Sequence, residues 1–299
     1  MIKTVLGNVN ESEIKAALCH EHVCGYSDYL MMMSGGKLFD EEELIMRSVS
    51  ILKWLKDNYE VNLFVDCTPV NIGRNVELLK TISRGSGVHI VCSTGLYYTE
   101  EPVLFNLPAD VLTEYYINDA KKTNAGVIKV AVESETLSDF NKKLLIVSAA
   151  TQRNTGLPIV LHTNAKNQNG IRALEILLSQ GVPSSAVTVG HLSDTNNFDY
   201  IKEIAGYGCY IGLDRLYLNT SKDYIEEKLK AINTLIDAGF EDKIILSHDE
   251  LIYNGFDIEP KIKNNPRFNY VFDNILKKLN NDVTQVIIRK NPINMLKCQ

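Results

Sequence analysis

Short apolar runs alternate with helix-like patterns along the whole chain, and this alternation restricts the fold more than any other feature. Near-continuous apolar strands are typical of a parallel sheet that helices cover on both faces. Eight repeats favour a closed (β/α)8 barrel, or TIM barrel, of the α/β class over an open doubly wound sheet, and no phosphate-loop glycine pattern follows the first strand. The predicted strands are residues 16–22, 61–67, 88–94, 127–131, 157–162, 187–191, 209–213 and 244–249, and the predicted helices are residues 40–56, 76–82, 109–122, 139–153, 171–179, 200–205, 223–237 and 270–279.

The chain of 299 residues is predicted to form one domain, residues 1–299, because no linker rich in Pro, Gly or Ser interrupts the pattern. A hydrophobic content of 45% is enough for a sizeable core. The formal charge of −6 argues against a nucleic-acid partner or an anionic membrane surface. We therefore expect a small-molecule substrate.

Apolar run lengths and cysteine usage predict a cytoplasmic protein. No run approaches the roughly 18 residues of a membrane span, and residues 1–8 lack the long apolar stretch of a signal peptide. The cysteines form no CxxC pair, which indicates neither a disulfide framework nor a thiolate zinc site. Reduced and buried thiols are expected at Cys19, Cys24, Cys67, Cys92, Cys209 and Cys298.

Five of the six histidines stand at the C-terminal ends of predicted strands, where a (β/α)8 barrel carries its functional residues. His20 and His22 are one residue apart, so on a strand they point to the same face, as two imidazole ligands of one metal require. His89 alone lies inside an apolar run and is interpreted as packing. The remaining three strand-end histidines are His162, His191 and His248. This placement predicts a metal site.

Two further residues bear on that site. Lys129 lies within an apolar strand, where a free ammonium is costly to bury. It either extends out of the barrel or is carbamylated by carbon dioxide and bridges two metals, and the surrounding histidines favour the carbamate. Asp249 can ligate a metal and accept a proton, or it can cap a helix. Because neighbouring strand residues face opposite sides, His248 is not expected to ligate beside an inward-facing Asp249.

Several short motifs in chain order carry a resemblance to a known family. They are residues 20–22, 66, 73–75, 82–84, 87–91, 94–97, 125–131, 161–163, 189–191, 194–195, 211–215, 247–249 and 291–292. With these motifs the sequence resembles the phosphotriesterase-related branch of the amidohydrolase superfamily, and especially its phosphotriesterase-like lactonases. The motifs span nearly the whole chain, so the resemblance covers the entire predicted barrel.

The resemblance implies a binuclear centre with a bridging residue. Some members of the family carry a glutamate as the bridge, and the match at Lys129 places this chain with the members that carry a carbamylated lysine. The more buried metal would be held by His20, His22 and Asp249, and the more exposed one by His162 and His191, with N6-carboxylated Lys129 between them. The implied substrate and proton-handling residues are Tyr97, Arg215, Asp194 and Asp249. Tyr97 could instead be a rim aromatic, and Arg215 could form a structural salt bridge with Asp214.

The predicted function is therefore hydrolysis of a lactone by a metal-bridging hydroxide. Coordination lowers the pKa of water by roughly 9 units, or about 12 kcal/mol, which outweighs the roughly 3–5 kcal/mol of a lone general base. Organophosphate-degrading relatives carry a histidine at the position of Arg215, so lactone chemistry is favoured. Both sugar lactones, plain or phosphorylated, and acyl-homoserine lactones fit, and the modest apolar content of residues 250–255 favours a compact polar one.

Several features of this prediction stay open. Alternative activities are hydrolysis of a small amide or of an organophosphate ester at the same centre. A barrel that binds metal or ligand without catalysis is the alternative outside enzymes. Zinc is the leading candidate for the two divalent ions, and manganese, iron or cobalt also suit imidazole and carboxylate ligands. A homodimer is an expectation from the resemblance.

Overall fold

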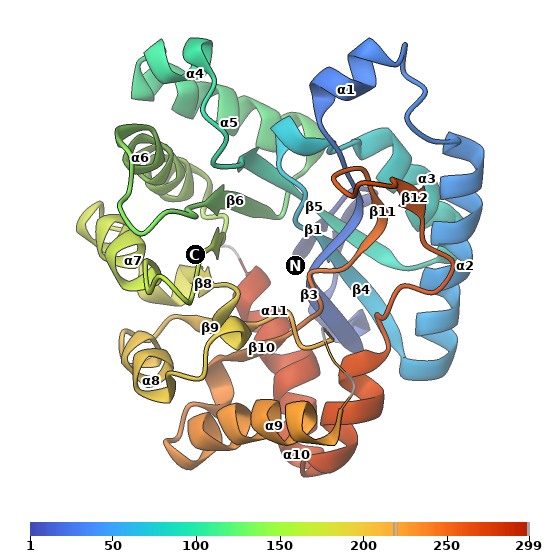
Figure 1. Ribbon diagram of the computed structural model, residues 1–299, viewed down its shortest axis with the longest axis vertical. Helices are drawn as coiled ribbons and strands as arrows, with labels where there is room; N and C mark the ends of the chain where they lie inside the picture. The colour runs from blue at the N-terminus through green and yellow to red at the C-terminus, as the bar shows by residue number, and fades with distance from the viewer. Residues whose placement is uncertain (218, 220, 298–299) are drawn as a thin grey trace.

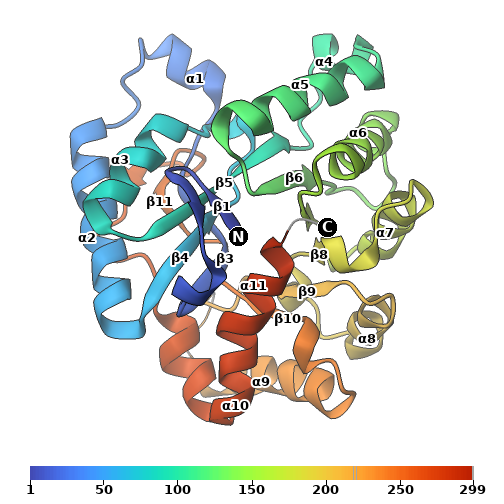
Figure 2. The ribbon, with the colours of Figure 1, turned by 180° about the vertical axis from the view of Figure 1, so that it is seen from behind.

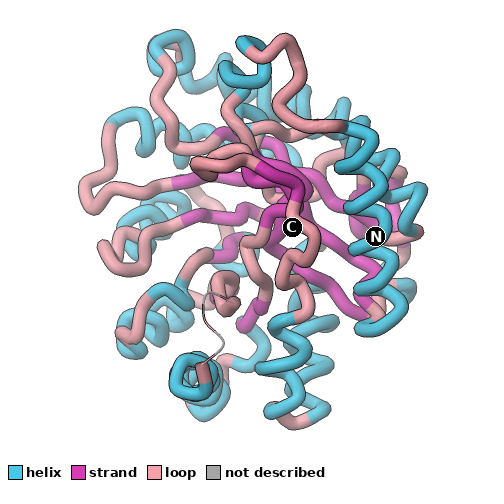
Figure 3. The backbone as a smooth tube through the Cα atoms, turned by 45° about the vertical axis from the view of Figure 1, so that its right-hand side comes forward, coloured by secondary structure: helices cyan, strands magenta, loops and turns pink. Residues whose placement is uncertain are grey.

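The computed structural model describes residues 1–217, 219 and 221–297. A curled parallel sheet lies at its centre, with helices around it, as Figures 1 and 3 show. Each core strand pairs in parallel with the next one along the chain. The predicted α/β TIM barrel is thus confirmed. The core strands are β3 (Ala16–Gly25), β4 (Val61–Asp66), β5 (His89–Leu96), β6 (Val127–Ala131), β7 (Ile159–His162), β8 (Val187–Val189), β9 (Tyr210–Leu213) and β10 (Ile244–Leu246).

The seam between the last and the first core strand is not an ordinary ladder. The Ser247 hydroxyl accepts hydrogen bonds from the backbone N–H groups of Cys19 and His20, at 2.7 and 3.0 Å. Beyond it, β11 (Leu251–Asn254) pairs in parallel with β3 and antiparallel with β12 (Lys261–Ile262). The strand predicted to reach residue 249 therefore ends at Leu246, and residues 247–250 form a separate segment that contacts β3.

Seven of the predicted helices form with boundaries shifted by a few residues. Local signals set these ends: the Asp40 side chain accepts the Glu43 N–H at the start of α2, and Gly87 ends α3 with a left-handed φ of 65°. The helices are α2 (Glu41–Tyr59), α3 (Val76–Ser86), α5 (Ala109–Thr123), α6 (Asp139–Thr155), α7 (Gly170–Ser179), α8 (Phe198–Gly206) and α9 (Lys222–Asp237).

The predicted helical stretch at residues 270–279 is helical, but a regular α-helix does not form there. In its place a π-helical turn at Val271–Ile275 is followed by a 3-10 turn at Leu276–Lys278. The helical path restarts where the Asn280 side chain accepts the Asp282 N–H. The restarted path comprises α10 (Asn281–Gln285), a π-helical turn (Val286–Lys290) and α11 (Asn291–Leu296).

Four short elements that the sequence did not predict lie outside this repeat. The N-terminal hairpin consists of β1 (Ile2–Thr4) and β2 (Gly7–Val9), which pair antiparallel. Helix α1 (Asp28–Met33) follows β3, and α4 (Pro102–Asn106) follows β5. Both helices therefore belong to loops at the C-terminal end of the barrel.

The interior of the barrel is a packed apolar core. Ala17, Leu63, Val91 and Val160 belong to it, and Tyr210 also lines it. The end of the barrel at which the strands begin is covered by the N-terminal segment and α11 (Figure 2), which contribute Ile2, Ile14, Met295 and Leu296 to the same core. The opposite end, where the strands terminate, is consequently the end available for a site.

The structure describes the helix lengths and the cysteine environments on which two of the predictions depend. Within the described part of the chain, no helix is long and apolar enough to span a membrane. The five cysteines it describes are free and buried, at positions 19, 24, 67, 92 and 209. Cys298 lies outside the described residues.

Candidate metal centre

A β-bulge in β3 aims the two opening histidines into the barrel. The register with β4 shifts between Leu18 and Glu21, so one extra residue is accommodated there. Cys19 therefore packs in the barrel interior while the next residue, His20, also reaches inward to Lys129. A bulge of this kind re-aims side chains at functional sites. After it, His22 shares the inward face with His20, and Glu21 faces the other way.

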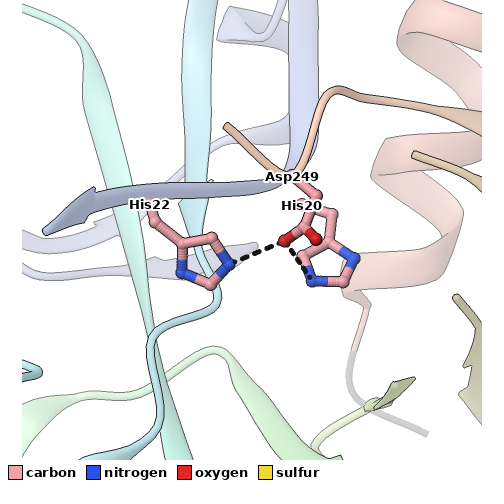
Figure 4. Close-up of side chains that lie close together, drawn as sticks. All are labelled: His20, His22 and Asp249. Carbon is pink, nitrogen blue, oxygen red and sulfur yellow. Dashed lines mark hydrogen bonds and ion pairs between the residues drawn. The ribbon is translucent and has the colours of Figure 1, made fainter. Parts of the chain in front are cut away.

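The predicted metal residues converge at the C-terminal ends of the strands. His20 Nε2 lies 2.5 Å from Lys129 Nζ and 3.5 Å from Asp249 Oδ1. His22 Nε2 lies 3.0 Å from the same Asp249 oxygen, as Figure 4 shows. Ligand atoms of His20, His22 and Asp249 all lie within 4.8 Å of one another, a spacing that could hold a metal ion.

The second pair of histidines forms the other half of the cluster. His191 Nε2 lies 2.7 Å from His162 Nδ1. The ring centroids of His20 and His191 are 5.0 Å apart, so the two halves are contiguous. All six residues predicted as metal ligands therefore come together. Each half offers inward-facing donors of the types that divalent metals bind.

A buried aspartate that the sequence analysis treated only as a salt-bridge partner holds the outer nitrogens of two histidines. Asp214 Oδ2 lies 2.5 Å from His20 Nδ1, and its Oδ1 lies 2.9 Å from His191 Nδ1. The His191 backbone N–H also donates to Oδ1, at 2.8 Å. His20, His191 and Asp214 also satisfy the spacing of a metal group. Because Asp214 contacts the Nδ1 atoms while both Nε2 atoms face the cluster, we interpret it as orienting the ligands.

The other two histidines have outer partners of their own. His22 Nδ1 lies 2.8 Å from the Thr68 hydroxyl, which donates its proton to the Cys24 carbonyl and so accepts from the imidazole. His162 Nε2 lies 3.0 Å from Glu133 Oε2. Each imidazole thus has one nitrogen held by the protein and one aimed at the cluster. This arrangement fixes tautomers in metal sites and fits a pair of divalent ions.

Glycines make room for the groups that orient the ligands. A Cβ atom on Gly190 would lie 3.0 Å from Asp214 Oδ2, and one on Gly212 would lie 3.1 Å from it. At Gly95, whose φ is +107°, a Cβ atom would lie 2.1 Å from the Lys129 carbonyl oxygen. Any side chain at these positions would displace the carboxylate or the strand that carries the lysine.

Lys129 stays inside the barrel, so the alternative of a lysine that extends into solvent is wrong. Its side chain is among the largest that are fully buried, with 2% of the residue exposed. Burial lowers the pKa of Lys129 because the interior disfavours its ammonium form. A neutral amine is the form that reacts with carbon dioxide, so this position is chemically suited to the predicted carbamate.

Asp249 occupies an unusual backbone conformation between the cluster and Arg215. Its φ of 53° is left-handed, which few residues other than glycine adopt. Strand β11 follows it, so the alternative of a helix cap is wrong. Its Oδ2 accepts a hydrogen bond from Arg215 Nε at 2.8 Å, while Oδ1 faces the histidines. The carboxylate therefore links the metal-binding groups to the pocket wall.

Arg215 pairs with two acids, and neither is the predicted Asp214. Besides Asp249, it contacts Asp194 through Nη1 at 2.9 Å. Burial raises the pKa of Asp194, although the neighbouring guanidinium opposes that effect. Its second oxygen, Oδ1, is buried with no hydrogen-bond partner among the described residues. Asp194 is thus connected to the cluster through the arginine.

Tyr97 lies against the second half of the cluster. Its ring meets the His162 ring edge-on with centroids 5.3 Å apart, and it stacks against Tyr98 at 4.3 Å. Burial raises the pKa of Tyr97 well above its usual range, because the interior disfavours a phenolate. The hydroxyl therefore remains a proton donor at ordinary pH.

The remaining two histidines lie outside the cluster. His248 is fully buried and points away, with its Nδ1 at 2.7 Å from Glu21 Oε1. His89 begins β5, at the opposite end of the barrel, and is only partly buried. The histidine partners Asp214, Glu133, Thr68 and Glu21 were not predicted from the sequence. The sequence did carry a signal for Asp214, which is an acid directly after an apolar strand. Nothing in the sequence pairs Glu133 with a histidine 29 positions away.

A pocket of about 510 Å³ opens over the cluster. Its walls away from the polar centre are largely apolar, in contrast to the compact polar site expected from residues 250–255. The difference arises because the loops after β4 and β5 contribute as much as the loop after β10. The apolar lining residues are Pro69, Ile72, Tyr97, Tyr98, Leu251 and Phe256.

Comparisons with known proteins agree over nearly the full length of the chain. The sequence model of the phosphotriesterase family matches residues 1–296. An aryldialkylphosphatase of Saccharolobus solfataricus is 29% identical, with 95% of this chain and 96% of that protein aligned. A phosphotriesterase-related protein of Nematostella vectensis is 30% identical, with 83% and 84% aligned. The N-acetyltaurine hydrolase of Mus musculus is 25% identical, with 83% of each chain aligned. The similarity thus covers the whole barrel.

Proposed function

This chain belongs to the phosphotriesterase family and is a metal-dependent hydrolase, and from that premise we propose that it opens the ring of a lactone with an apolar substituent. The observation that carries this proposal is the set of four imidazoles, each with its outer nitrogen held by the protein and its other nitrogen directed into the cluster beneath the pocket. Histidines that ligate a metal almost always have their other ring nitrogen held in this way.

The proposed ligands divide between two ions. His20, His22 and Asp249 would hold one, and His162 and His191 the other, with Lys129 as an N6-carboxylated bridge. When bound, two divalent ions would polarise a substrate carbonyl and lower the pKa of water toward 7. The donor set, imidazole and carboxylate, admits zinc, manganese, iron or cobalt.

The pocket residues would handle the substrate and the proton. Asp249 lies between the imidazoles and Arg215, where it can take a proton from water and deliver it to the ring oxygen as the carbon–oxygen bond breaks. Tyr97 keeps its proton and can donate a hydrogen bond to the carbonyl oxygen. Arg215 donates hydrogen bonds to Asp249 and Asp194 and stays protonated, so it would hold the Asp249 carboxylate in place.

The pocket walls favour a substrate with an apolar part. A sugar lactone would expose hydroxyl groups to Ile72, Leu251 and Phe256, whereas an acyl-homoserine lactone would bury alkyl carbons there. The pocket volume of about 510 Å³ admits a short to medium acyl chain. A short-chain acyl-homoserine lactone is therefore the leading substrate class.

Hydrolysis of a small amide is the second candidate. The observation in its favour is the 25% identity with the murine N-acetyltaurine hydrolase. The same groups would serve, because an amide also presents a carbonyl and a leaving group that needs a proton. The aryldialkylphosphatase relative makes a phosphotriester the third substrate class to test.

A substrate panel on the metal-loaded protein tests the proposal. We expect short-chain acyl-homoserine lactones to be hydrolysed faster than sugar lactones, N-acyl amines and a phosphotriester, when acid release is followed with a pH indicator. Chelation should abolish turnover, and zinc or manganese should restore it. Hydrolysis of amides alone would replace the lactone proposal with the amide one. Tight metal binding without any hydrolysis would indicate a binding barrel.

A further inference from the structure

We propose that Glu21 is a positioning residue whose buried carboxylate fixes the backbone on both sides of Asp249. The inference rests on the proposed function, because it assumes that Asp249 holds a metal with His20 and His22. Glu21 stands between those two histidines in β3 but faces away from the cluster, and none of it is exposed to solvent. It has no part in the mechanism proposed above.

The Glu21 carboxylate accepts hydrogen bonds from the residues on either side of Asp249. The His248 backbone N–H donates to Oε1 at 2.9 Å, and the Glu250 backbone N–H donates to Oε2 at 3.1 Å. Between them, the Asp249 N–H donates to the His20 carbonyl at 2.9 Å. Three successive amides of this segment are therefore bound by two adjacent residues of β3.

These backbone hydrogen bonds from residues 248–250 to β3 form a clamp, and a side-chain contact strengthens it. His248 Nε2 accepts the Val271 N–H at 3.2 Å, so the imidazole proton must be on Nδ1. That Nδ1–H donates to Glu21 Oε1 at 2.7 Å. All three partners of the Glu21 carboxylate are thus N–H groups, and the carboxylate acts only as an acceptor toward them.

The clamp matters because Asp249 has a left-handed backbone with a φ of 53°. A non-glycine residue adopts this conformation only where its surroundings enforce it. The conformation sets the direction of the side chain, and so the 3.0 and 3.5 Å separations of Oδ1 from the Nε2 atoms of His22 and His20. We infer that Glu21 transmits the register of β3 to Asp249 and keeps these three ligands together.

The test uses the metal-loaded full chain and the variant Glu21→Gln. Glutamine replaces one carboxylate oxygen with an N–H₂ group, which cannot accept from a backbone N–H. The hydrogen bonds at one end of the clamp are therefore lost, while the volume of the side chain hardly changes. Outer partners of ligands are worth about 10–100-fold in metal affinity. We expect a loss of that size for one ion of the two, measured by competition with a chelator, and altered absorption of one bound cobalt ion. Asp119→Asn is the matched control, because it weakens a carboxylate–arginine pair between Asp119 and Arg74 on the outside of the barrel.

A second pair of variants guards against misfolding of Glu21→Gln. His248→Asn keeps a nitrogen donor near Glu21 and should retain a metal affinity close to that of the wild type, whereas His248→Leu removes the donor and should lower it. Wild-type metal affinity in both Glu21→Gln and His248→Leu would overturn the inference about Glu21 but not the proposed function. An equal loss of affinity for both ions would do the same. A wild-type chain that binds no divalent metal would overturn the proposed function and this inference with it.

Discussion

The two halves of the histidine cluster use the same kinds of donor but are held differently. In the half formed by His20, His22 and Asp249, the orienting groups are buried, with Asp214 at 1% and Thr68 at 1% exposed. In the other half, His162 depends on Glu133, whose side chain is 41% exposed. A hydrogen bond that is shielded from water orients its partner more firmly than one that competes with solvent. We therefore expect the first half to bind its metal more tightly.

Asp249→Asn should have the largest effect, because Asp249 belongs to the tight half and also handles the proton. With metals retained, we expect turnover to fall by about 10²–10⁴-fold, the usual contribution of a general acid–base group. The measurement is kcat for the best lactone, with metal content determined on the same sample. Near-normal turnover in a fully loaded variant would refute the proton role of Asp249.

Asp214→Asn should lower the metal affinity of both halves. Asp214 holds His20 and His191, one from each half, so an amide in its place can accept from one imidazole while its N–H₂ opposes the other. We expect the affinity for both ions to fall by about 10–100-fold. Chelator competition followed by metal analysis measures both steps. A loss confined to one ion would show that Asp214 serves only one half.

Glu133→Gln should sharpen the difference, because it affects only the half that is already weaker. Glutamine can still accept from His162 Nε2 but lacks the charge of the carboxylate, and the hydrogen bond that is weakened is partly exposed. A decrease of about 10-fold in affinity for one ion is expected, at the lower end of the range for outer partners. The first ion should be retained at wild-type affinity, and its loss would contradict the assignment of Glu133.

Tyr97→Phe should have the smallest effect on the centre itself. Removing one hydrogen-bond donor costs about 1 kcal/mol, or roughly 5–10-fold in kcat/KM, without loss of metal. Since burial raises the pKa of Tyr97, the phenol stays protonated through pH 9. The alkaline limb of the pH–rate profile should therefore be the same in the variant and the wild type. A limb that disappears in Tyr97→Phe would assign that ionisation to Tyr97.

The sequence predicted the barrel because each core strand is an apolar run and most of the predicted strands end at a polar residue. It also predicted which side chains meet, since parallel strands end at one face of a barrel. It did not reveal how those side chains are held. The bulge that turns His20 inward depends on register with β4, and the Glu133–His162 and Glu21–His248 contacts join residues 29 and 227 positions apart. Neither register nor such pairing is visible in one sequence.

The C-terminal segment illustrates a different limit. Residues 270–279 have a helical apolar pattern, yet the chain turns there in π and 3-10 geometry. One contact in this segment is the Val271 N–H to the buried His248 ring. Tertiary contacts of this kind override local propensity.

The most direct test of the account is anomalous X-ray scattering from crystals of the metal-loaded protein. We predict two peaks. One should lie within bonding distance of His20 Nε2, His22 Nε2 and Asp249, and the other within bonding distance of His162 Nδ1 and His191 Nε2. Density for a carboxylated Lys129 should lie between them. An unmodified lysine with no ion beside it, or ions bound to the outer nitrogens near Asp214 or Glu133, would contradict the account.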